Sequence, residues 1–238
     1  MKVAIINLSG NIGKSTIGTS LLSPRIPNIG AENFFSVEST NTGAESEGID
    51  LITLKGKQFG DMQDQLLRYD SAVVDVGSSN VSDWLKLLQQ YSGSHEEFDY
   101  FVVPVLNDFK VITDSIKTIR ALKAVGVDKK RVRVVFNRVE VDDDIQDIFA
   151  PIFGLSESEK NCVVNPKSVI YNNQIFEMLK ENGISITEVL NDETDYRALL
   201  RTAQTEEDKD LAITRIKLKQ LSRSAKQNLD DVFTVLFK

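Results

Sequence analysis

Residues 2–16 read KVAIINLSGNIGKST, and this stretch decides the fold. Its first part, residues 2–8, is an apolar run rich in β-branched side chains, which predicts a buried strand. Residues 14–23 have apolar side chains at helical spacing, and Pro24 ends the predicted helix. The turn between them contains glycines, which accept positive φ angles. Because a helix N-terminus presents free backbone N–H groups to an anion, this order of elements predicts a phosphate-binding loop.

The loop also has the side chains that bind a nucleoside triphosphate with magnesium. Lys14 would reach the β- and γ-phosphates of ATP, and the Ser15 hydroxyl would ligate Mg²⁺. The strict pattern G-x-x-x-x-G-K-[ST] fails at one position, since its first glycine falls on Leu8. The alternative is a tight turn that caps a helix, with Lys14 on the surface. The residues predicted to bind the nucleotide here are Ser9, Gly10, Asn11, Ile12, Gly13, Lys14, Ser15 and Thr16.

Strands and helices alternate along the rest of the chain, without an internal repeat. This alternation predicts an α/β fold, with a mostly parallel twisted sheet and helices on both faces. After about residue 190 the pattern becomes helical and charged, which predicts a nucleotide-binding domain over 1–190 and a C-terminal helical extension over 191–238. The predicted strands are 33–38, 48–54, 71–76, 101–106, 131–137 and 163–165, and the predicted helices centre on Phe59–Leu66, Val81–Tyr91 and the face Ile112, Ile116 and Ile119.

Two carboxylates end predicted strands, at the edge of a parallel sheet where ligands bind. Asp75 would hold Mg²⁺ through water, and Gly77 would direct its N–H toward the γ-phosphate. The alternative role for Asp75 is to cap the following helix. Glu38 would orient a water or the metal, or it is a solvated loop residue. Lys14, Asp75 and Glu38 are therefore the predicted catalytic residues, and Ser15 and Asp75 the predicted metal ligands.

Composition excludes several classes of site. The single cysteine, Cys162, rules out a disulfide within the chain and a zinc or iron–sulfur site made of several cysteines. A net charge of −7 argues against a surface that binds nucleic acid everywhere. Residues 214–238 are an exception, because six Lys and Arg residues oppose only Asp230 and Asp231 there. We call 214–238 the basic stretch.

No apolar run approaches the roughly 20 residues that span a bilayer, and the N-terminal run lacks a signal-peptide cleavage site. We therefore expect a cytoplasmic protein without a membrane span.

Six segments of the chain carry a resemblance to a known family. They are MKVAIINLSGNIGKS at 1–15, LLSPR at 21–25, VESTN at 37–41, VVDVG at 73–77, VVPV at 102–105 and VVFNR at 134–138. With these segments the sequence resembles the ParA/MinD group of deviant-Walker P-loop ATPases, over roughly residues 1–190. Within that group it is most similar to plasmid StbB-type stability proteins and TraL-type conjugal transfer proteins.

The resemblance implies roles for particular residues. It places Gly10 to Thr16 on the nucleotide loop and Asp75 at the Walker B position, with Glu38 near an acidic position at the end of the second strand. Asn137 matches an asparagine that hydrogen-bonds adenine. Proteins of this group dimerise around ATP and position DNA with a DNA-binding adaptor protein.

One departure from the group concerns catalysis. Ser9 stands where the group has a signature lysine that reaches the partner subunit's phosphates, and Asn11 replaces a glycine. A missing positive charge would slow phosphoryl transfer. Arg25 and Arg138 are the candidates to replace that charge.

Three functions remain open at this point. The first is a slowly hydrolysing ATPase that forms a homodimer with ATP and acts as a switch in plasmid stability, partition or conjugative DNA transfer, with the basic stretch touching DNA non-specifically. The second is a nucleotide-binding partner module without hydrolysis, and the third is an ATP-dependent ligase or kinase. For the basic stretch, a solvated helix face is the alternative.

Overall fold

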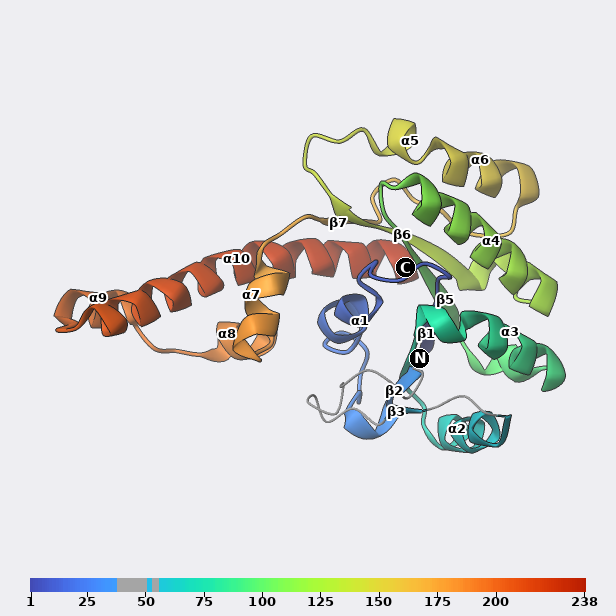
Figure 1. Cartoon of the computed structure of the whole chain (residues 1–238), viewed down its shortest axis with the longest axis horizontal. Coiled ribbons are helices and arrows are strands. Elements are labelled where there is room, and N and C mark those ends of the chain that lie inside the picture. The colour runs from blue at the N-terminus through green and yellow to red at the C-terminus, as the bar shows by residue number, and fades with distance from the viewer. Residues whose placement is uncertain (38–50, 53–55) are drawn as a thin grey trace.

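The computed structural model describes the backbone of residues 1–37, 51–52 and 56–238 and the side chains of residues 1–37 and 59–238 (Figure 1). Glu38 and most of the predicted strand 48–54 lie outside the described residues. The described strands form one seven-stranded sheet in the order β3-β2-β4-β1-β5-β6-β7, and every pair is parallel. They are β1 Lys2–Ile5, β2 Phe34–Val37, β3 Leu51–Ile52, β4 Ala72–Val76, β5 Tyr100–Val105, β6 Val132–Val139 and β7 Val169–Tyr171.

The central strands are buried on both faces, which explains their continuous apolar sequences. β4 is buried at every position, and β1 at every position after Lys2. β1 lies between β4 and β5, so that Ile5 pairs with both Asp75 and Val102. The chain that follows β1 therefore leaves the sheet at its middle, beside the carboxyl end of β4.

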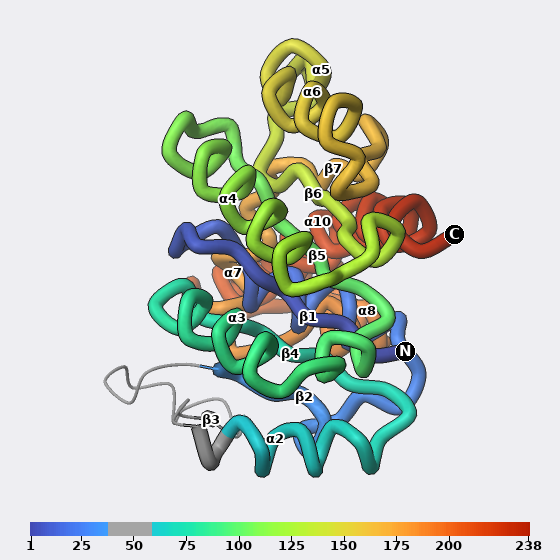
Figure 2. Tube along the Cα trace, turned by 90° about the vertical axis from the view of Figure 1, so that its right-hand side faces the viewer, coloured from blue at the N-terminus to red at the C-terminus, as the bar shows by residue number. Residues whose placement is uncertain are grey.

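One face of the sheet is covered by the helices in front in Figure 2. The aromatic centre of this layer is Trp84, whose ring lies edge-on to Phe98 and Phe101 at centroid distances of 5.7 and 6.2 Å. The predicted helices around Phe59–Leu66 and Val81–Tyr91 are confirmed here. The helices of this face are α2 Gly56–Arg68, α3 Val81–Gln90, α4 Phe109–Val125, α5 Ile145–Ile148 and α6 Ala150–Glu159.

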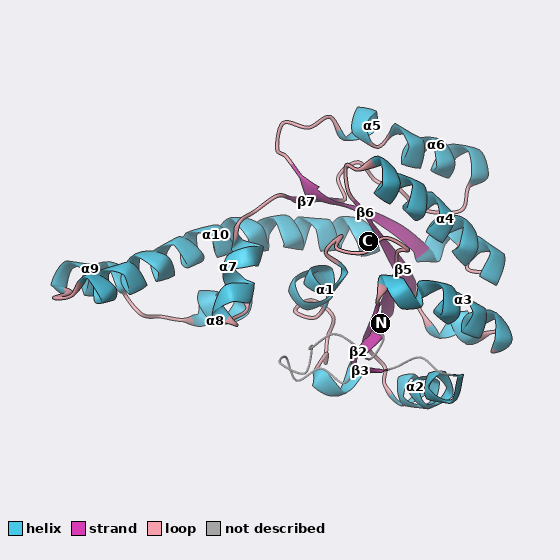
Figure 3. Cartoon of the chain, in the orientation of Figure 1, coloured by secondary structure: helices cyan, strands magenta, loops and turns pink. Residues whose placement is uncertain are grey.

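The opposite face is covered by the helix after the loop and by the C-terminal helices (Figure 3). The predicted helix 14–23 is confirmed as α1 Lys14–Thr16, which continues as a π-helical segment over Ile17–Leu22. Gly18 lets this segment approach β2, because a Cβ at this position would lie 2.8 Å from the Phe34 ring. The remaining helices of this face are α7 Ile175–Asn182, α8 Ile186–Asn191 and α10 Glu206–Phe237, with α9 Tyr196–Thr202 at the far end of α10 (Figure 1).

The predicted C-terminal extension is helical, and its last half is part of the core. Leu218, Leu229 and Leu236 of α10 are 0–3% exposed and belong to the same apolar cluster as Val3 and Ile5 of β1. The N-terminal part of α10 and α9 instead reach away from the sheet (Figure 1). The division of the chain at residue 190 stays a prediction. None of the described helices is long and apolar enough to cross a membrane.

One prediction about an individual element was wrong. Residues 163–165 form only a single bridge, between Val163 and Arg133, because the turn at Pro166–Lys167 ends the pairing; the next strand is β7. The predicted isoleucine face of α4 is confirmed, because Ile119 is buried and Ile112 and Ile116 are partly buried against the same apolar cluster. Ser115 and Thr118 are fully buried beside Ile119, and they hydrogen-bond to the chain after β1.

Candidate functional site

The loop between β1 and α1 has the backbone shape that its glycines suggest. Gly13 has φ 83° and Asn11 has φ 56°, both in the left-handed region that favours glycine and tolerates asparagine. Glycine is required at position 13 for a second reason, since a Cβ there would lie 2.5 Å from Asn137 Nδ2. A Cβ at Gly10 would lie 3.1 Å from Ser78 Oγ, so the loop also runs close to the segment after β4.

Lys14 lies within this loop and not on the surface. Its side chain is buried, and Nζ donates hydrogen bonds to Ser9 O at 2.8 Å and Asn7 O at 3.4 Å. The ammonium group therefore rests beside the backbone that begins the loop. This arrangement contradicts the alternative of a helix-capping turn with an exposed lysine.

The two predicted metal ligands meet. Ser15 Oγ donates a hydrogen bond to Asp75 Oδ2 at 2.6 Å, and Asp75 is buried at the end of β4. Asp75 does not cap the following helix, because the N-cap of the 3₁₀ segment Ser78–Asn80 is Gly77 and that of α3 is Asn80. A hydroxyl and a carboxylate side by side are oxygen ligands of the kind that Mg²⁺ prefers, and Mg²⁺ typically uses one or two carboxylates together with substrate phosphates. The residues present therefore fit a magnesium ion bound together with a triphosphate.

The segment after Asp75 is joined to the end of β2. Gly77 N donates to Val37 O at 2.8 Å, and Asn80 Nδ2 donates to the same oxygen at 3.2 Å. The N–H of Gly77 therefore contacts β2 in this structure and not a γ-phosphate position. Glu38 follows Val37 directly but lies outside the described residues, so its catalytic role stays a prediction.

Asn137 lies against the loop from the end of β6. Its side chain is 6% exposed, and Nδ2 donates to Ile12 O at 2.9 Å. The pairing of β6 with β7 is irregular between Asn137 and Val139, and Arg138 has φ 53° and an exposed side chain. Asn137 thus shapes the loop, and its predicted bond to adenine stays a prediction.

Polar residues of α4 hold the start of the loop, and sequence reasoning did not identify them. Leu8 N donates to Thr118 Oγ1 at 3.1 Å, and Ser9 Oγ donates to Asp114 Oδ2 at 2.9 Å. Asn7 Nδ2 donates to Ser115 Oγ at 2.7 Å. The sequence contains one signal that could have indicated them: Asp114, Ser115 and Thr118 are polar residues at helical spacing beside the isoleucines of the same helix.

Asp114 is the charged member of this group. The hydrogen bond from the Ser9 hydroxyl lowers the pKa of Asp114, partial burial opposes this, and Lys117, whose Nζ lies 3.2 Å from Oδ1, adds to the lowering. The Ser9 side chain is therefore directed at a carboxylate that is ionised at neutral pH.

Arg25 does not supply a positive charge to the loop. Its Nε lies 2.8 Å from Asp230 Oδ1 of α10, and NH1 donates to Ser20 O at 2.8 Å and Leu21 O at 3.1 Å. These contacts join the end of the helix after the loop to α10. The other arginine considered for the missing charge, Arg138, is exposed and follows Asn137, which contacts the loop.

The basic stretch is partly occupied by contacts within the chain. Lys219 Nζ donates to Thr194 O at 2.9 Å and lies 5.0 Å from the centre of the Tyr196 ring, and Lys226 pairs with Asp230 at 2.6 Å. Lys217 and Arg223 are exposed.

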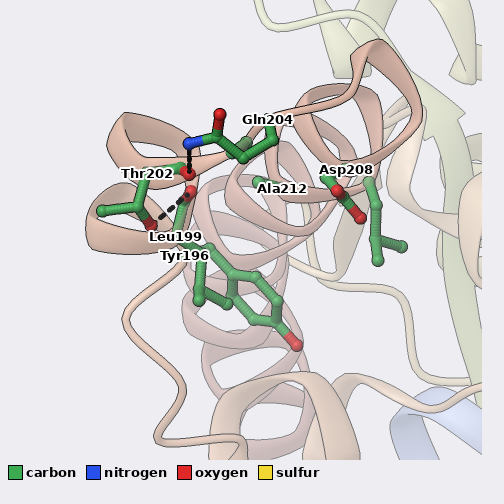
Figure 4. A pocket seen from close by; sticks show the side chains of 8 residues that line it. Tyr196, Leu199, Thr202, Gln204, Asp208 and Ala212 are labelled. Atoms are coloured by element: carbon green, nitrogen blue, oxygen red, sulfur yellow. Dashed lines mark hydrogen bonds between the residues drawn. The ribbon is translucent and has the colours of Figure 1, made fainter.

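A cavity of about 250 Å³ lies between α9 and α10 (Figure 4). Tyr196, Leu199, Leu211 and Ala212 are among the residues that line it. Because α9 lies at the far end of α10 from the loop (Figure 1), this cavity is not part of the nucleotide site.

Comparison with known proteins identifies the fold. No protein-family model matches the chain, and no curated protein matches it significantly. The MinD cell division protein of Aquifex aeolicus matches with a TM-score of 0.55 at 13% identity, over 99% of this chain and 96% of that chain. A chain of the MinC:MinD cell division protein complex of the same organism matches with a TM-score of 0.57 at 12% identity, over 99% and 95%.

A ParA family ATPase from Chlorobium tepidum matches with a TM-score of 0.51 at 13% identity, over 96% of each chain. Identities this low show the fold alone. The predicted fold is confirmed: this chain has the fold of the ParA/MinD-type P-loop ATPases, with a long C-terminal helix.

Proposed function

We propose that this chain is a nucleotide-dependent switch that binds ATP with Mg²⁺ on the loop of residues 9–15 and hydrolyses ATP slowly. One observation supports the proposal most directly: the buried Lys14 within the loop and the 2.6 Å contact of Ser15 with Asp75 lie together at the start of α1. This combination provides backbone N–H groups and an ammonium for phosphates, with oxygen ligands for a divalent cation. A turn that only caps a helix would need neither a buried ammonium group nor a pair of oxygen ligands.

Each residue has a separate task in this proposal. The backbone of residues 10–15 would surround the β-phosphate, and Lys14 would exchange its contact with Ser9 O for phosphate oxygens. Ser15 and Asp75 would hold Mg²⁺, which would neutralise part of the negative charge of the phosphates. Asn137 would keep Ile12 and Gly13 in the shape that the phosphates need, through its bond to Ile12 O.

Slow hydrolysis follows from the charge at the start of the loop. Position 9 is a serine, and its hydroxyl contacts Asp114, so that this position contributes no positive charge to a transition state. The same observation favours the second candidate function, a nucleotide-binding partner module without hydrolysis. Measured turnover separates the two candidates.

The biological role that we propose is plasmid stability, partition or conjugative DNA transfer, which rests on the sequence resemblance to StbB-type and TraL-type proteins. In this role ATP would favour a homodimer, and the chain would act with a DNA-binding adaptor protein. Lys217 and Arg223 of the basic stretch, which are exposed, would touch DNA phosphates without reading sequence.

Light scattering with ATP, ADP or GTP in the presence of Mg²⁺ tests the switch, alongside a phosphate-release assay. We expect the mass to double with ATP and not with ADP, and phosphate release to be slow. Bound ATP without any change in mass and without phosphate release would support the partner module in place of the switch.

A further inference from the structure

The start of the nucleotide loop is held from one side by a single helix. Thr118, Ser115 and Asp114 of α4 contact Leu8, Asn7 and Ser9 in that order, at 3.1, 2.7 and 2.9 Å. Thr118 and Ser115 contact the two residues that precede the loop, whereas Asp114 contacts Ser9, the first residue of the loop. Asp114 is therefore the member of this set that reaches the loop itself.

Ser9 is fixed at both its backbone and its side chain. Its N–H donates to Asn7 Oδ1 at 2.9 Å while its hydroxyl donates to Asp114 Oδ2 at 2.9 Å. The residue is 3% exposed. Its carbonyl in turn accepts from Lys14 Nζ at 2.8 Å. The position of Ser9 thus sets the resting place of the lysine that is expected to bind phosphate.

We propose that Asp114 is a positioning residue of the nucleotide loop, which acts on bound phosphate through Ser9. The inference rests on the proposed function, since it assumes that the loop binds ATP. A loop that is ordered before the ligand arrives loses less conformational entropy on binding, and the affinity is higher for that reason.

Electrostatic repulsion and a positioning role predict opposite effects on ATP affinity when the Asp114 side chain is removed. A carboxylate beside a site for phosphates repels them, so electrostatics alone predicts that removing Asp114 tightens ATP binding. Positioning predicts weaker binding. Two lysines on the same side of α4 reduce this repulsion. Lys117 Nζ lies 3.2 Å from Asp114 Oδ1, and Lys110 lies one turn closer to the N-terminus of the helix. The sign of the effect therefore decides between the two explanations.

The test is calorimetric titration of MgATP into the natural protein, Asp114→Ala, Asp114→Asn and Asp83→Ala. The control is matched, because Asp83 in α3 pairs with Lys86 three residues later at 2.9 Å, as Asp114 pairs with Lys117. Within the described part of the chain, Asp83 has no hydrogen bond to the loop. We expect about a tenfold rise in Kd for Asp114→Ala, the size expected for one charge-assisted hydrogen bond. Asp114→Asn keeps an oxygen that can accept from Ser9 and should bind MgATP at least as tightly as the natural protein.

Hydrogen exchange on the nucleotide-free proteins gives a readout that does not depend on ATP. Asp114→Ala should speed exchange at the amides of Leu8 and Ser9 while β1 stays protected, and Asp114→Asn and Asp83→Ala should not. Global loss of protection in Asp114→Ala would assign the residue to stability and overturn the proposal.

A double-mutant cycle with Ser9→Ala completes the test. If Asp114 acts through Ser9, its removal should have little further effect on Kd in the Ser9→Ala background. Equal or tighter binding by Asp114→Ala, or additive effects of the two substitutions, would overturn the positioning role while leaving the proposed function intact. Absence of ATP binding by the natural protein would overturn both.

Discussion

Replacing Gly13 by alanine should lower the free energy of unfolding by about 2 kcal/mol, from two separate causes. The first is backbone strain: φ is 83°, and a residue with a Cβ in this region costs about 1 kcal/mol. The second is a collision, because the new Cβ would lie 2.5 Å from Asn137 Nδ2. Asn137 must then move, and its buried hydrogen bond to Ile12 O is lost at a cost of about 1 kcal/mol.

Gly93 is the matched control for the strain alone. It has φ 90°, and a Cβ there would meet nothing within 4 Å. Gly93→Ala should therefore cost only the strain, about 1 kcal/mol. In a chain that already carries Asn137→Ala, the collision is removed, and Gly13→Ala should cost no more than Gly93→Ala. The difference between the two backgrounds, about 1 kcal/mol, is the contribution of the contact between the loop and β6.

Equilibrium urea unfolding of the natural protein, the three single variants and Gly13→Ala/Asn137→Ala measures these quantities. The midpoint should fall while the slope stays constant, since the surface exposed on unfolding does not change. If Gly13→Ala costs the same as Gly93→Ala, or the same with and without Asn137, the described packing of the loop against β6 is incorrect.

Three further predictions concern α10 and the region before it. Leu229→Ala should destabilise the fold by about 3 kcal/mol, because Leu229 is 1% exposed beneath the sheet, whereas Leu211→Ala, at 56% exposed, should change stability by less than about 0.5 kcal/mol. Lys217→Glu/Arg223→Glu should weaken retention of duplex DNA and flatten its salt dependence, while Lys129→Glu/Lys130→Glu on another exposed segment should not; equal retention by both variants would refute a DNA role for the basic stretch. Hydrogen bonds from Thr194 and Tyr196 lower the pKa of Asp192, so its ionised form adds stability above the unfolded pKa of about 4, and that stability is lost as pH falls through the lower folded pKa. The destabilisation by Asp192→Asn should accordingly be constant from about pH 5 to 8 and shrink below about pH 4 in urea unfolding, and a difference that persists into strong acid would contradict this reasoning.

The sequence predicted those parts of the site that are local in the chain. Residues 2–16 form one strand–turn–helix unit, so their spacing alone indicated the loop that contains Lys14 and the start of α1. The contact between Ser15 and Asp75 could also be predicted from the sequence. Ser15 lies after the loop that follows β1, and Asp75 lies near the end of the neighbouring parallel strand β4; the carboxyl ends of such strands meet at one edge of the sheet.

Contacts between distant residues were not predictable in the same way. Asn137 reaches Ile12 across 125 residues, and Asp114 reaches Ser9 across 105. Such contacts depend on the order of strands and on the rotation of α4, which buries Ser115 and Thr118 beside the predicted isoleucines. Buried serine and threonine side chains look like exposed ones in a sequence pattern, because their burial is favourable only when a specific partner accepts or donates a hydrogen bond.

Short elements were a second source of error. A strand at 163–165 has the apolar composition of a buried segment, yet Pro166 has no N–H for the ladder, and the turn at Pro166–Lys167 delays the last strand to Val169–Tyr171. The helical structure of α10 was easier to predict from the sequence than its packing against the sheet. Its charged sequence suggested an extension, while its leucines at wider spacing bury its last half against the sheet.

Titration of MgATP into the natural protein and into Lys14→Ala, followed by calorimetry, tests the central claim most directly. Our account predicts saturable binding of one ATP per chain by the natural protein. It predicts that Lys14→Ala binds at least a hundredfold more weakly, about 2.7 kcal/mol, while both proteins unfold at similar urea concentrations. Absence of binding by the natural protein, or equal binding by the two proteins, would contradict the assignment of this loop as a nucleotide site.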